Sequence, residues 1–124
     1  MTISERLKQM QSNQETYPLT LPNLDEEGND LVVYFTKLTV REDERLRKKH
    51  PDFYKTMTEG DIPSFKAMVD LLIIKCKDEE GKPIFSQADE MFLSNQDIGY
   101  ITTVCTKLIE KLFDFPDVET SQGN

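Results

Sequence analysis

The sequence feature that most constrains the fold is a wide apolar stripe between residues 65 and 76. Apolar side chains recur there at spacings of three and four residues, at Phe65, Met68, Val69, Leu72, Ile73 and Cys76. Side chains at this spacing share one face of an α-helix, and other elements must cover that face. The stripe therefore predicts a helix at the centre of the core, with Asp61 as its N-cap and Pro63 in its first turn.

A second apolar stripe predicts a long helix towards the C-terminal end. Its members again follow one another at spacings of three and four residues: Ile98, Ile101, Cys105, Leu108 and Leu112. Ser94 and Asp97 have the spacing of a helix N-terminus. Between the two stripes, a short helix is expected to run from Ser86 to near Leu93.

Upstream of the first stripe, the pattern changes from helical to extended. Residues 17–24 and 31–38 are rich in alternating apolar, β-branched and aromatic side chains, and a loop around Gly28 separates them. This pattern predicts a β-hairpin with a solvated acidic tip. Residues 41–60 then predict a charged helix, and Thr39 and Glu42 before it have capping-box spacing. Pro51 is expected to kink this helix or divide it into two, because proline disrupts the helical backbone.

These elements together predict an α+β fold that is predominantly α-helical, with an N-terminal β-hairpin packed on a bundle of four to five helices. We expect residues 17–114 to form a single globular domain, because 124 residues leave little room for two. Residues 1–16 are expected to be a flexible or short-helix N-terminal arm, and Thr2 and Glu5 have capping-box spacing there. Residues 115–124 are expected to be a disordered tail.

The charge and hydropathy patterns argue against several classes of function. The formal net charge is −8, from 15 Lys and Arg against 23 Asp and Glu, which disfavours binding to nucleic acids or anionic membranes. No apolar run approaches the ~18 residues of a membrane span. The N-terminal residues also lack the apolar stretch of a signal peptide, so we expect a cytosolic protein. Cys76 and Cys105 fall in the apolar stripes and are expected to be buried thiols.

No set of residues in the sequence suggests catalysis. His50 is the single histidine, and it stands in a charged segment without a nucleophile and orienting partner. We interpret it as a solvated or helix-end residue. Asp70 lies in the apolar helix four residues after Lys66, at the edge of the stripe, which favours an exposed ion pair. We therefore expect neither an enzyme, nor a metal site, nor a bound cofactor.

Apolar side chains also gather at the ends of two predicted segments. They are Phe53, Tyr54, Met57, Leu112, Phe113 and Phe115. Exposed patches of this kind mark protein interfaces, whereas buried ones simply close the core. Both interpretations stay open, and the residues themselves indicate an acidic, mostly helical interaction module without naming its partner.

One stretch of the chain resembles a known family. The apolar helix VDLLIIKC (69–76) leads into the acidic turn KDEEGKPIF (77–85) and the short acidic segment SQAD (86–89). Upstream, YFTKLTVREDE (34–44) supplies a strand, a Leu-Thr step and a charged helix. The motifs and their order resemble the tail assembly chaperones of long-tailed, lambda-like bacteriophages (siphoviruses), over residues 18–113.

The resemblance implies a non-enzymatic chaperone that binds the phage tape-measure protein and promotes assembly of the tail tube. It further implies self-association, and recruitment of the major tail (tube) protein by a longer, frameshifted form. The chaperone would act in the host cytoplasm during assembly and be absent from the mature virion. The alternative is a phage structural component, such as a head–tail connector subunit.

Overall fold

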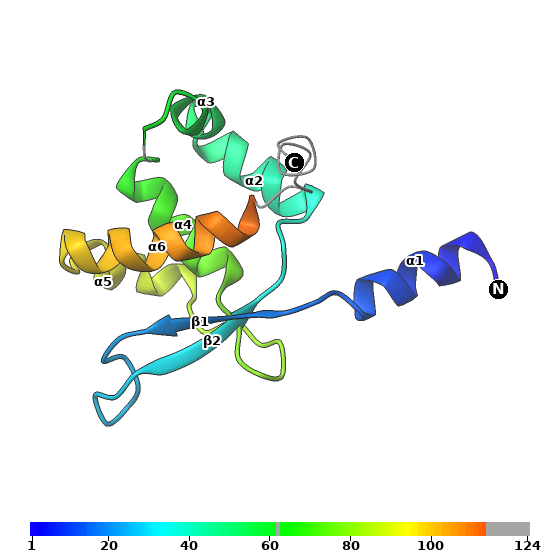
Figure 1. The fold of residues 1–124 in the computed structure, drawn as a ribbon, viewed down its shortest axis with the longest axis horizontal. Coiled ribbons are helices and arrows are strands. Elements are labelled where there is room, and N and C mark those ends of the chain that lie inside the picture. The colour runs from blue at the N-terminus through cyan, green and yellow to red at the C-terminus, as the bar shows by residue number, and fades with distance from the viewer. Residues whose placement is uncertain (62, 114–124) are drawn as a thin grey trace, which may run out of the picture.

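The computed structural model describes residues 1–61 and 63–113 and has an α+β, mostly helical fold (Figure 1). Its elements in chain order are α1 (Ile3–Ser12), β1 (Tyr17–Leu21), β2 (Leu31–Phe35), α2 (Val40–Lys49), α3 (Phe53–Thr58), α4 (Phe65–Lys75), the 3-10 helix η1 (Gln87–Asp89), α5 (Glu90–Ser94) and α6 (Ile98–Leu112). The predicted fold class is confirmed, since an N-terminal hairpin packs on a group of helices.

The hairpin presents one apolar face to the helices. In its antiparallel register Leu19 pairs with Val33, and Leu21 pairs with Leu31. Alternate residues of a strand point to the same face, and Leu19, Leu21, Val33 and Phe35 are accordingly buried. The hairpin is joined to the end of α4, because Tyr34 and Lys77 exchange two backbone hydrogen bonds of 2.7 and 2.9 Å.

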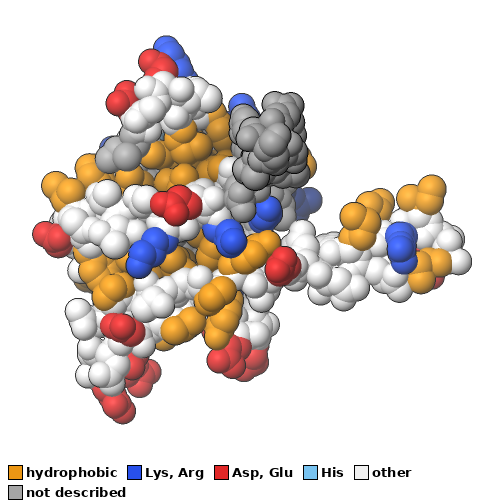
Figure 2. Space-filling model, viewed as in Figure 1, with side chains coloured by type: hydrophobic (Ala, Val, Ile, Leu, Met, Phe, Trp, Pro, Cys, Tyr) orange, Lys and Arg blue, Asp and Glu red, His pale blue; other side chains and the backbone are white. Residues whose placement is uncertain are grey.

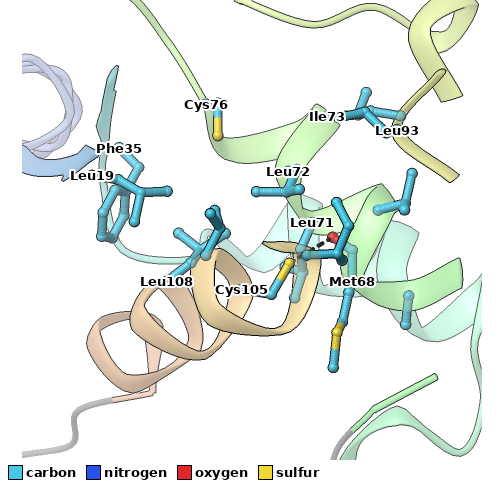
Figure 3. Packing of buried hydrophobic residues seen from close by; sticks show 14 of the residues in the cluster. Leu19, Phe35, Met68, Leu71, Leu72, Ile73, Cys76, Leu93, Cys105 and Leu108 are labelled. Carbon is cyan, nitrogen blue, oxygen red and sulfur yellow. Dashed lines mark hydrogen bonds between the residues drawn. The ribbon is translucent and has the colours of Figure 1, made fainter. Parts of the chain in front are cut away.

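Helix α4 is the centre of the core, as predicted, but it is buried on every side rather than along one stripe. Every residue from Ala67 to Lys75 is buried, whereas Phe65 is 41% exposed. Helices α2, α5 and α6 all pack against it. Figure 3 shows Leu71 and Leu72 of α4 on the side of the helix that faces α6, with its Cys105 and Leu108. The remaining sides of α4 are therefore covered by elements that a single-helix pattern does not reveal.

The start of α4 differs from the predicted one. The N-cap is Ser64, whose side-chain oxygen accepts a hydrogen bond of 3.2 Å from the backbone N–H of Ala67. Pro63 precedes this cap rather than lying in the first turn, and Asp61 stands three residues before it. A serine oxygen at this position satisfies a helix N–H that would otherwise lack a partner.

The charged segment before α4 is divided in two, one of the two outcomes predicted around Pro51. Helix α2 ends at Lys49 and α3 begins at Phe53.

Asp97 alone caps α6, by accepting a 3.1 Å hydrogen bond from the backbone N–H of Tyr100. Ser94, which shares the predicted spacing, is instead the last residue of α5.

Asp70 is buried and does not form the exposed pair with Lys66 that its position suggested. Its Oδ2 lies 2.6 Å from Nε2 of His50, and its Oδ1 lies 4.0 Å from Nζ of Lys49. His50 is the C-cap residue of α2, so the predicted helix-end position is confirmed. The pairing of His50 with Asp70 connects the end of α2 to the middle of α4.

Helix α1 stands clear of the rest of the described structure (Figure 1). The capping box between Thr2 and Glu5 is formed, with hydrogen bonds of 3.1 Å in both directions. None of its residues is buried. The predicted tail, residues 115–124, lies outside the described residues, and the proposed domain limits stay predictions.

Within residues 1–61 and 63–113, none of the helices combines the length and apolarity that a membrane crossing requires.

Candidate partner-binding surfaces

Three of the six apolar residues singled out from the sequence form an aromatic cluster. The ring centroids of Phe53 and Tyr54 in α3 lie 5.9 and 5.6 Å from that of Phe113, which follows α6. These separations suit tilted and edge-on ring contacts. Phe53 is buried, as is Leu112 in the last turn of α6. The cluster therefore holds α3 against the C-terminal end of α6.

Tyr54 also connects this cluster to α2. Its hydroxyl donates a hydrogen bond to Asp43, and the guanidinium of Arg47 lies 4.1 Å from its ring centroid. Burial raises the pKa of Tyr54, and the hydrogen bond to Asp43 raises it further. The phenol therefore stays protonated at neutral pH and acts as a structural donor.

A groove opens beside the aromatic cluster, between α3 and α6. We call it the α3–α6 groove; it has a volume of about 350 Å³, and its lining residues are Met57, Gly60, Asp61, Pro63, Met68, Thr106, Ile109, Glu110 and Phe113. Figure 2 shows hydrophobic side chains gathered between these two helices. Among the residues that the structure describes, the charged ones that line it are the carboxylates Asp61 and Glu110.

The six predicted residues thus have different surroundings. Met57 and Phe113 line the α3–α6 groove and are half-buried, so part of each is open to a partner. Phe53 and Leu112 contact the core, and Tyr54 is held by the cluster. Phe115 lies outside the described residues. Their role in binding a partner stays a prediction.

A second apolar surface lies around α5, and sequence reasoning missed it. We call the depression there the α5 groove; it has a volume of about 230 Å³, and its lining residues are Leu21, Leu24, Leu72, Phe85, Asp89, Phe92, Leu93, Gln96, Tyr100 and Val104. One wall is fixed by the hydroxyl of Tyr100, which donates a 2.7 Å hydrogen bond to the carbonyl oxygen of Pro22. This contact holds the end of the hairpin against α6.

The exposure of α5 follows from its length. A helix of five residues makes little more than one turn, so it can direct only one of three consecutive apolar residues inward. Leu93 is that residue, with 7% of its surface exposed, whereas Met91 and Phe92 are 68% and 67% exposed. The run Met91-Phe92-Leu93 was the sequence signal that could have revealed this surface.

The two cysteines contribute to the core rather than to a reactive site. Burial raises the pKa of both Cys76 and Cys105 to about 12. Nucleophilic chemistry needs the thiolate, which is scarce at neutral pH at such a pKa. The Sγ of Cys105 donates to the carbonyl oxygen of Met68 at 3.5 Å, a contact drawn in Figure 3.

The described residues contain no group of three or more His, Cys, Asp or Glu side chains arranged to hold a metal ion. What the α3–α6 and α5 grooves offer is apolar contact beside carboxylates. Such surfaces bind apolar side chains, above all those of a helix whose flanking residues are basic.

No protein-family model matches the sequence, and no curated protein matches it either. Among solved structures, the fold is similar to that of the bacteriophage HK97 tail assembly chaperone, with a TM-score of 0.49 at 17% sequence identity. The similarity covers 93% of this chain and 97% of that chain.

Proposed function

We propose that this chain is a non-enzymatic phage tail assembly chaperone that binds the tape-measure protein through the α3–α6 groove. The observation that carries the proposal is an open apolar groove on a strongly acidic chain. The identity of the client comes from the resemblance of the motifs in residues 34–44 and 69–89 to this family.

The physical argument concerns what a holdase needs. A protein that keeps an apolar helical client in solution must expose apolar surface, and it needs net charge to stay soluble itself. Apolar residues of a client helix at spacings of three and four would enter the groove beside Met57 and Phe113. The carboxylates of Asp61 and Glu110 would favour Lys or Arg at the flanks of that helix.

The remaining parts of the proposal concern the setting of this binding. A longer, frameshifted form would recruit the major tail (tube) protein. The chaperone would act in the host cytoplasm and leave the assembly before the virion is complete.

Co-purification with the tape-measure protein tests the proposal. The tagged chain, co-expressed with that protein, should retain it, and Met57→Glu and Ile109→Glu should each abolish retention by placing a charge in the apolar groove. Val40→Asp is the matched control, because Val40 is an exposed apolar residue at the start of α2. Thermal unfolding should show that all three variants are folded.

Two results would contradict the proposal. One is that the wild-type chain retains no tape-measure protein. The other is that both groove variants, shown to be folded, retain it as well as Val40→Asp does. Mass spectrometry of purified virions tests the alternative, since a head–tail connector subunit would be present there in fixed stoichiometry and the proposed chaperone would be absent.

A further inference from the structure

Helix α1 carries an apolar face that its own chain leaves uncovered. Ile3, Leu7 and Met10 lie on one side of the helix and are 81%, 59% and 62% exposed. Figure 2 shows apolar side chains on this helix well away from the body of the molecule. An isolated helix of ten residues is marginal in water, even with a good cap. Helix α1 therefore needs a surface to pack against.

We propose that the apolar face of α1 docks into the α5 groove of a second copy of this chain. The family resemblance already implies self-association, and the new element here is the pair of surfaces that would form the contact. Neither surface belongs to the α3–α6 groove, so a failure of client binding there would leave this proposal standing.

Charge complementarity supports the pairing of these two surfaces. Helix α1 carries Arg6 and Lys8 against Glu5, so it has a net charge of +1, while the rest of the chain carries −9. Arg6 lies three residues after Ile3 and four before Met10, so it borders the apolar face, whereas Glu5 lies on the opposite side. The basic border of α1 is thus directed at whatever its apolar face contacts.

The surroundings of the α5 groove are acidic in return. Within residues 1–61 and 63–113, Asp89 is the charged residue that lines it. The adjoining hollow shares Leu24 with the groove and is lined by Asp25, Glu26 and Glu27. The charged side chains that the described part of the chain places at these two sites are therefore all carboxylates, which attract Arg6.

The position of the groove favours a second copy over the chain's own groove. Helix α1 joins β1 at Tyr17, whereas the groove lies beside Leu21 and Leu24, at the other end of that strand. The strand spans about 13 Å from Tyr17 to Leu21. The five Cα steps from Ser12 to Tyr17 reach at most ~18 Å when fully extended, so residues 13–16 would have to reverse direction and run back along most of the strand. Docking on a second copy needs no such change.

The two partners use different surfaces, so the interface is heterologous. Each copy would offer both an arm and a groove, and association would continue into closed rings or open chains as concentration rises. Light scattering coupled to size-exclusion chromatography should show a mass that increases with concentration. The association should also weaken with added salt, because the flanking charges are exposed.

Paired variants test the proposal directly. Leu7→Asp places a charge on the apolar face of α1, and Phe92→Asp places one in the α5 groove. Each substitution should weaken self-association by about tenfold or more, because burying a Leu or Phe side chain contributes at least that factor. An equimolar mixture of the two variants should form a 1:1 heterodimer. In that heterodimer the unchanged α1 of Phe92→Asp would dock into the unchanged α5 groove of Leu7→Asp. Both residues are exposed, so thermal unfolding should be unchanged, and Phe92→Ala is a milder groove variant should Phe92→Asp fail to fold.

Matched control variants distinguish this specific contact from non-specific association. Arg6→Gln and Gln9→Glu change the net charge equally, but Gln9 lies on the face opposite the apolar residues, so only Arg6→Gln should weaken association. A wild-type chain that stays monomeric at every concentration would overturn the proposal. So would folded Leu7→Asp and Phe92→Asp variants that associate like wild type, or a mixture of monomeric variants that forms no heterodimer.

Discussion

The ammonium group of Lys75 is the most deeply buried charge in the described structure, and the carboxylate of Glu42 balances that charge. Only 1% of Lys75 is exposed. Its Nζ donates to Oε1 of Glu42 at 2.7 Å, to Oγ1 of Thr36 at 3.1 Å and to the carbonyl oxygen of Lys37 at 3.2 Å. Burial lowers the pKa of Lys75, and the hydrogen bond and charge of Glu42 oppose that shift.

The informative perturbation is Glu42→Gln. Glu42 also accepts a 3.0 Å hydrogen bond from the backbone N–H of Thr39 in the capping box of α2, and a glutamine can keep that bond. The substitution therefore removes the charge with little other change. Breaking a buried ion pair from one side costs about 3–5 kcal/mol, and the 21% exposure of the Glu42 side chain places this case near 3 kcal/mol. At about 4 °C per kcal/mol, Tm should fall by about 12 °C.

Lys75→Met should behave quite differently. It removes the buried charge together with the need for a partner, and Glu42 keeps its contact with solvent. Replacing a buried ion by an apolar side chain of similar length is often close to neutral, so we expect a change within about 1 kcal/mol. The double variant should be close to Lys75→Met alone, so the double-mutant cycle should give a coupling of about 3 kcal/mol, the whole of the Glu42→Gln loss.

The pH dependence of the Glu42→Gln loss gives an independent check. The pKa of Lys75 is lower in the folded than in the unfolded protein, so the folded state binds this proton more weakly. Stability from this group therefore rises as pH approaches the ordinary lysine value of about 10.4. Removing Glu42 lowers the folded pKa further, so the deficit should shrink as pH rises from neutral towards that ordinary lysine value. Equal losses for Glu42→Gln and Lys75→Met in urea unfolding, or a deficit independent of pH, would refute this reasoning.

Three further predictions concern the core and its helix caps. Leu71→Ala, at the fully buried centre of α4, should lower the free energy of unfolding by about 3–4 kcal/mol in urea titrations. Ser64→Ala should cost about 1 kcal/mol in the same assay and Asp61→Ala less than about 0.5, because only Ser64 caps α4. At pH 8, Cys76 and Cys105 should resist a thiol reagent in the folded protein and react rapidly in urea, because burial raises the pKa of both thiols to about 12.

The parts of the fold that sequence reasoning predicted are those determined by local pattern. The hairpin follows from a change to extended, β-branched residues around Gly28, and α6 follows from its apolar spacing. The capping boxes of α1 and α2 depend on residues three positions apart, so they too are visible in the sequence. In each case the interaction that forms the element lies within the element itself.

The parts that escaped prediction depend on contacts between distant residues. Asp70 was placed at an exposed edge because a helical wheel describes one helix and says nothing of how many neighbours surround it. Its partner His50 lies 20 residues away, and the pairing of Lys75 with Glu42 spans 33. A carboxylate and an ammonium inside an apolar helix were therefore signs that α4 is enclosed on all sides, with partners brought by α2.

The same limit applies to the candidate binding surfaces. Phe53 and Leu112 were grouped with Met57 and Phe113 because all lie at the ends of helices, but only the packing of α3 on α6 decides which of them are covered. Surface exposure is a property of the assembled fold, so the sequence alone does not show which of these apolar residues belong to the core and which to an interface.

Charge shows what a whole-chain average conceals. The net charge of −8 combines −9 on the rest of the chain, where carboxylates surround the α5 groove, with +1 on α1. A uniformly acidic surface would keep two copies apart, whereas a basic, apolar arm beside an acidic, apolar groove draws them together in one orientation. The average therefore predicts solubility, and the division of charge between segments predicts which surfaces attract one another.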